Sequence, residues 1–136
     1  NVFGYAATGK GNNTFTLGNG SITGLYCNVT SITSLSDARD KKNIESLPFG
    51  LDFIAKLRPV QFEWNCRDGS KTNTTGTGFI AQEMLSAQNE KGAGVLDLVD
   101  VSNSEELMTR AGNLIPVLVK AVQELSVELE MLKSKL

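Results

Sequence analysis

The chain has 136 residues, of which 40% are hydrophobic and 21% charged, and its formal net charge is −2. This length fits one small domain, or a small domain with an appendage. A weakly acidic chain without a basic block argues against nucleic acid as the main partner, and no apolar run is long enough to cross a membrane. Because the sequence has no histidine, it excludes Ser-His-Asp catalysis, Cys-His catalysis and histidine zinc sites.

The first 35 residues differ in composition from the rest. They contain one charged residue, Lys10, while the other 27 follow residue 35. Such a segment is too small for its own core, and the chain lacks a start methionine, so we expect a fragment of a longer protein. Residues 14–17 and 21–32 mix apolar and small polar residues around a Gly-Asn-Gly turn. This pattern predicts the end of a repetitive β-structure such as a β-prism or β-helix; a flexible polar tail is the alternative.

A charged segment starts at residue 36 and leads into a small mixed domain. Ser46 is predicted to cap a helix that begins near residues 47–48 and ends at Pro59. Its apolar face is expected to comprise Leu47, Leu51, Ile54 and Leu57.

A hairpin is predicted next. Residues 60–64 alternate as a strand, with Val60, Phe62 and Trp64 on one face. Residues 65–77 form a polar loop or a long hairpin around an Asp-Gly turn. We expect this segment to be an exposed arm that reaches the preceding β-structure or a neighbouring chain; an unstructured loop is the alternative.

The following elements are a helix and one or two strands. Residues 81–89 are predicted to be helical until Gly92 and Gly94 end the helix, and residues 95–101 read as one strand or two short ones. The carboxylates of this run, Asp97 and Asp100, are interpreted as solvated or loop carboxylates without a metal. The two cysteines, Cys27 and Cys66, are too few for a disulfide framework or a four-ligand metal site, and are expected to be free and mostly packed.

The C-terminal residues carry an unbroken heptad pattern, with a helix predicted over about residues 111–136. Apolar residues recur there at spacings of four and three, which favours a self-associating parallel coiled coil. The alternative is an amphipathic helix packed on its own domain. Pro116 is expected to kink or start this helix. The predicted trimer seam comprises Ile115, Leu118, Val122, Leu125, Leu129 and Leu132.

Residues 33–136 resemble a known family through four motifs in a fixed order. These are SDARDKKNI (36–44), LRPVQFEW (57–64), GFIAQEM (78–84) and NLIPVLVKAVQEL (113–125). They are similar to the C-terminal intramolecular chaperone domain of bacteriophage tailspikes, tail fibres and endosialidases, the auto-processing peptidase domain of S74 type. The resemblance implies a homotrimer that folds its own β-stranded fibre stalk and then cuts itself off with a Ser-Lys dyad.

The resemblance also implies which residues perform the cut. The cleaved bond would join Leu35 and Ser36, with Ser36 as nucleophile and Lys41 as base. The surrounding motif residues, which are expected to hold the geometry, are Asp37, Arg39 and Asn43.

The residues themselves support this placement in two ways. A serine hydroxyl needs an adjacent base, and a chain without histidine offers lysine as that base once burial or positive neighbours lower the lysine pKa. The break in composition also falls at the Leu35–Ser36 bond. The alternative is that Ser36 merely begins a charged loop in which Lys41 is solvated.

The predicted fold class is therefore α+β. Residues 1–35 form the end of a trimeric β-stranded stalk, and residues 36–136 form a small mixed domain with a protruding hairpin and a helix in a parallel trimeric coiled coil. The predicted function is an intramolecular chaperone that releases itself by autoproteolysis.

Two other functions stay open. The first is a permanent structural or receptor-binding fibre tip without cleavage, and the second is a protease acting in trans. The expected partners are two identical chains and the chain's own stalk, with no nucleic acid, membrane, metal or cofactor. The expected location is a virion tail-fibre precursor assembled in the host cytoplasm, from which the chaperone part is released.

Overall fold

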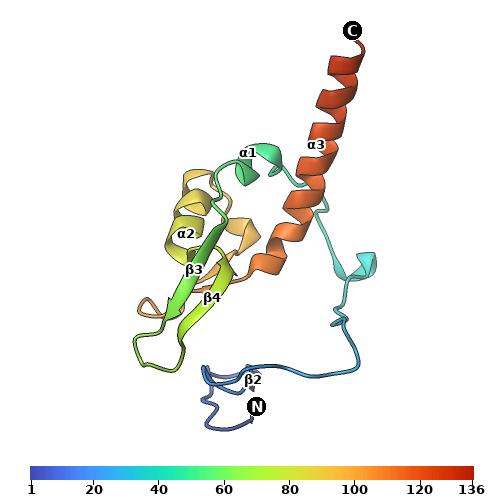
Figure 1. Cartoon of the computed structure of the whole chain (residues 1–136). Coiled ribbons are helices and arrows are strands. Elements are labelled where there is room, and N and C mark those ends of the chain that lie inside the picture. The colour runs from blue at the N-terminus through green and yellow to red at the C-terminus, as the bar shows by residue number, and fades with distance from the viewer. The chain divides into compact units, whose positions relative to one another are not determined.

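The computed structural model describes residues 1–136, which form two compact units. One unit comprises residues 1–42 and 62–76, and the other comprises residues 43–61 and 77–136. The chain mixes helices with three two-stranded sheets, so the predicted combination of helices and small sheets is confirmed (Figure 1). No helix combines the length and apolarity that crossing a membrane requires.

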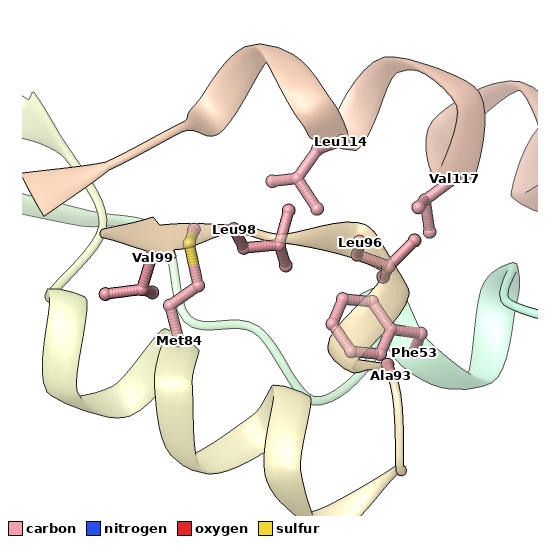
Figure 2. Close-up of a cluster of buried hydrophobic side chains, with 8 residues drawn as sticks. All are labelled: Phe53, Met84, Ala93, Leu96, Leu98, Val99, Leu114 and Val117. Atoms are coloured by element: carbon pink, nitrogen blue, oxygen red, sulfur yellow. The ribbon is translucent and has the colours of Figure 1, made fainter. Parts of the chain in front are cut away.

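The second unit is built around one apolar core. It contains α1 (Leu51–Ile54), α2 (Ala81–Glu90), the 3-10 turns η2 (Gly94–Leu96) and η3 (Ala111–Leu114), and α3 (Ile115–Lys133). The strands β5 (Val99–Asp100) and β6 (Met108–Thr109) pair antiparallel between them. Side chains from both ends of this sequence range meet in the core, as Figure 2 shows. Its buried members are Phe53, Met84, Ala93, Leu96, Leu98, Val99, Leu114 and Val117.

Polar side chains hold the loop between α2 and α3 against this core. The buried Gln88 accepts a hydrogen bond from the Leu98 backbone N–H at 2.8 Å. Arg110 forms ion pairs with Asp97 at 2.9 Å and with Asp100 at 3.3 Å. Asp97 is 66% exposed in the loop after η2, which agrees with the prediction of a solvated or loop carboxylate, whereas Asp100 is 35% exposed and ends β5.

Residues 95–101 form less strand than predicted. Residues 94–96 make a 3-10 turn, and Asp97 adopts a left-handed conformation with φ of +48°. This backbone conformation interrupts any extended run, so only residues 99–100 pair as a strand. The helix predicted over residues 81–89 is confirmed by α2, and Gly92 follows it with φ of +61°.

The helix α1 is much shorter than the sequence predicts, and its cap is a different residue. Residues 46–49 are irregular, so the prediction that Ser46 caps a helix there is wrong. The carboxylate of Glu124 on α3 instead accepts the Leu51 backbone N–H at 2.8 Å. A methyl group on Gly50 would lie 2.6 Å from the same carboxylate oxygens, so this approach requires glycine.

The predicted hairpin is confirmed. The strands β3 (Val60–Asn65) and β4 (Thr72–Gly78) form one sheet, joined by residues 66–71. Asp68 accepts the Ser70 backbone N–H at 2.9 Å and Gly69 has φ of +72°, which agrees with the Asp-Gly turn. The rings of Phe62 and Trp64 meet edge to face with centroids 5.0 Å apart, which confirms that they share a face.

Residues 1–35 contain little regular structure within one chain. Their only strands, β1 (Val2–Phe3) and β2 (Thr16–Leu17), pair in parallel. Residues 21–32 form no strand, so that prediction is wrong for the single chain. A strand requires a neighbouring strand for its N–H and C=O groups, and the chain offers these residues none. Cys27 is free but exposed, not packed, whereas the free Cys66 is half-buried.

Candidate functional site

A short turn connects the predicted nucleophile to the predicted base. The 3-10 turn η1 (Ala38–Asp40) begins after Asp37, whose extended backbone and side-chain cap are typical of an N-cap residue. The Asp37 carboxylate accepts the Arg39 backbone N–H at 2.8 Å. At the other end, the Lys41 backbone N–H donates to the Ala38 carbonyl at 3.1 Å. This turn reverses the chain direction within five residues.

The reversal brings the Lys41 amine onto Ser36. The Lys41 Nζ donates to Ser36 Oγ at 2.6 Å and to the Ser36 carbonyl oxygen at 3.0 Å. A nucleophile and a base must lie within about 3.2 Å for direct proton transfer. The structure therefore brings the two sequence-predicted catalytic residues together at the distance that a Ser-Lys pair requires.

The two supporting residues next to the dyad form a pair of their own. Arg39 Nε donates to Asp37 Oδ1 at 3.0 Å, and Arg39 Nη2 contacts Asp37 Oδ2 at 2.7 Å. The hydrogen bonds from Arg39 lower the pKa of the Asp37 carboxyl below its ordinary value, and the same pair raises the pKa of Arg39. The third supporting residue, Asn43, adopts a left-handed conformation with φ of +54°, which asparagine tolerates better than most residues.

The site is open in the single chain. Ser36 and Lys41 are exposed, and the side chain of Leu35 is 79% exposed. The bond predicted to be cut is thus accessible, and neither Ser36 nor Lys41 is buried. No cluster of three or more cysteine, aspartate or glutamate residues could hold a metal ion, and a serine-lysine pair needs none for acyl transfer.

The predicted trimer seam lies on one face of α3. All its six residues are exposed, between 46% for Leu118 and 64% for Val122. Pro116 stands in the first turn of α3, so the predicted helix start there is confirmed. A different stripe, containing Leu114, Val117 and Ala121, is buried in the chain's own core. The helix thus has two apolar faces, one filled within the chain and one unpartnered.

Sequence reasoning missed the residues that connect distant segments. Glu124 caps α1, and Gln88 and Asn113 bind backbone groups of the loop at residues 96–98. Glu124 is one of several polar residues on its helix, and nothing in the sequence distinguishes it as the residue that caps α1. Only Asp37 had a local signal, because aspartate followed by a turn is a common N-cap pattern.

Comparison with known families identifies part of the chain. The model of the peptidase S74 family, described as the chaperone of endosialidase, matches residues 36–93. Residues 36–93 are therefore similar to this family of chaperones, and the similarity covers less than half of the chain. The match begins at Ser36 and ends before α3. No curated protein and no solved structure matches the chain.

Proposed function

We propose that the chain is an intramolecular chaperone that trimerises and folds a phage tail fibre or tailspike, then releases itself by cutting the Leu35–Ser36 bond. The observation that carries the proposal is the 2.6 Å contact between Lys41 Nζ and Ser36 Oγ at the first residues of the family match. The exposed seam of α3 supports the trimer, because a soluble monomer rarely leaves so long an apolar stripe uncovered.

The cleavage proceeds through an ester. Neutral Lys41 takes the Ser36 hydroxyl proton while Ser36 Oγ attacks the Leu35 carbonyl carbon. The tetrahedral intermediate collapses with cleavage of the Leu35–Ser36 C–N bond, and the leaving Ser36 nitrogen receives the proton from Lys41. Water then hydrolyses the ester between Leu35 and Ser36 Oγ. The products are residues 1–35 with a new carboxylate and residues 36–136 with a new amine.

Trimer assembly controls both the folding of the stalk and the self-cleavage. Three chains that interleave into one β-structure must close long loops before their contacts stabilise them, which makes folding slow. A coiled coil of three α3 helices keeps the chains at high effective concentration. Assembly also removes water from the dyad, and desolvation favours the neutral amine that the mechanism needs. Cleavage therefore follows assembly of the precursor in the host cytoplasm.

Intact-mass measurement of the purified chain and three variants tests the proposal. Ser36→Ala and Lys41→Ala should each remain full-length trimers, because one removes the nucleophile and the other the base. The matched control, Lys42→Ala, removes the neighbouring cation and should still yield the two products. Normal cleavage in Lys41→Ala, or loss of cleavage only in Lys42→Ala, would show that the base is wrongly assigned.

The second candidate function is a permanent fibre tip with the same trimer and no chemistry. The exposed seam favours it as much as it favours the chaperone, whereas the dyad geometry does not bear on it. A single full-length band for the wild-type chain on a denaturing gel, identical to that of Ser36→Ala, would establish this function instead.

A further inference from the structure

The segment between Ser36 and Lys41 contains a carboxylate, that of Asp37, which is a second type of acceptor for a lysine amine. Asp37 follows Ser36 directly and lies four residues before Lys41. An ammonium group binds a free carboxylate more strongly than it binds a neutral hydroxyl, because the full negative charge of the carboxylate adds Coulomb attraction to the hydrogen bond. In the structure, however, both recorded partners of Lys41 are atoms of Ser36.

Arg39 explains why Lys41 stays on Ser36. Its backbone N–H, Nε and Nη2 all donate to the Asp37 carboxylate, at 2.8, 3.0 and 2.7 Å. Both carboxylate oxygens are therefore engaged by one residue through a two-point guanidinium contact, which an ammonium cannot reproduce. No residue of η1 is buried, so these local contacts and the turn's backbone hydrogen bonds alone shape it.

We propose that Arg39 is a positioning residue that occupies the Asp37 carboxylate and thereby keeps the Lys41 amine on Ser36. This inference rests on the proposed self-cleavage. Without Arg39, the Asp37 carboxylate takes Lys41, withdraws it from Ser36 and holds it in its charged form. Neither of the other charged side chains on this segment, Asp40 and Lys42, contacts the Asp37 carboxylate, whose partners all belong to Arg39.

The test measures the cleavage rate of the full chain against pH by intact mass. Arg39→Ala should slow cleavage about 100-fold, the cost of a small misplacement of a catalytic group. It should also move the pH of half-maximal rate upward by about one unit, because a neighbouring carboxylate favours the protonated amine. Arg39→Lys keeps the positive charge but cannot make the two-point contact. Its cleavage rate and its pH of half-maximal rate should lie between those of the wild-type chain and Arg39→Ala.

A double variant separates this role from a purely structural one. When Asp37→Asn is combined with Arg39→Ala, the competing charge is gone, while the amide oxygen that replaces the carboxylate can still cap the turn. The pH of half-maximal rate should therefore return to the wild-type value and the rate should recover in part. Arg58→Ala, which breaks an exposed pair with Glu83 in the other unit, is the matched control and should cut normally.

The failures are distinguishable. A double variant as slow as Arg39→Ala, or an Arg39→Ala variant with the wild-type pH profile, would overturn this inference and leave the self-cleavage in place. A wild-type chain that stays uncut at every pH would overturn both. Sedimentation of each variant shows whether it still assembles. If a variant does not assemble, Arg39→Lys takes its place when the cleavage rates and pH profiles are compared with those of the wild-type chain.

Discussion

Residues 1–35 and the unit of residues 43–61 and 77–136 differ in where their apolar side chains find partners. In the second unit, Phe53 and Leu98 are almost completely enclosed by the chain's own helices and loops (Figure 2). In residues 1–35, no large apolar side chain is buried, and Tyr26 and Ile32 are 92% and 99% exposed. This region also has only one charged residue, Lys10.

The chain thus contains one part whose apolar side chains are buried by its own contacts and one part whose apolar side chains stay exposed in the single chain. The helix α3 has both kinds of apolar side chain, because Val117 is buried in the core while the adjacent Leu118 is exposed on the seam. Three α3 helices brought together would cover the seam without disturbing the core. Each of the following experiments tests this division between the two regions.

Charging the seam should have the largest effect. Replacing Leu125 and Leu129 together by aspartate places two desolvated charges per chain at the helix contact. We expect complete loss of the trimer in analytical ultracentrifugation, with the helical content of the monomer retained in circular dichroism. The matched control replaces Val127 and Met131 by aspartate, since these are exposed on α3 outside the seam; it should remain a trimer. A trimer in the seam variant would show that α3 does not organise the assembly.

Removing the hairpin arm should affect residues 1–35 alone. Gly20 lies so close to Ser70 that a methyl group on Gly20 would come within 2.9 Å of Ser70 Oγ. Deleting residues 65–77 should leave a soluble trimer of the C-terminal part and lower the protease-resistant yield of residues 1–35 several-fold. Unchanged yield would contradict the role of the arm, and Gly20→Ala tests the same contact without a deletion.

Truncating the core should destabilise the second unit by a moderate amount. Phe53→Ala leaves a cavity at a side chain that is 1% exposed, and should lower the free energy of unfolding by about 3–5 kcal/mol. Tyr26→Ala should change it by less than about 0.5 kcal/mol. Urea unfolding of the monomeric seam variant gives both values. A large loss from Tyr26→Ala in the monomer would mean that residues 1–35 pack within one chain.

Removing the α1 cap should have the smallest effect. Glu124→Ala leaves the Leu51 N–H without its carboxylate partner and should cost about 1 kcal/mol of stability. Glu128→Ala, an exposed glutamate one turn further along α3, is the control and should change the free energy of unfolding by less than about 0.5 kcal/mol. Equal losses in the two variants would show that the cap does not stabilise α1.

Features that depend on neighbours along the chain could be predicted from the residue order. Alternation and the Asp-Gly turn predicted the β3–β4 hairpin, and Pro116 marked the start of α3. The five-residue separation of Ser36 and Lys41 was also readable as part of a family motif, and the structure brings the two side chains together. These features need only local dihedral preferences and side-chain periodicity, which the residue order contains.

Features that depend on partners far away in the sequence could not be predicted in this way and became visible in the folded chain. The N–H of Leu51, where α1 begins, binds Glu124, which lies 73 residues away in the chain. The division of α3 into a buried stripe and an exposed seam depends on what packs against each face, and both stripes are apolar in the sequence. Residues 21–32 have a strand pattern but no strand, because backbone pairing requires a second strand that the single chain does not supply.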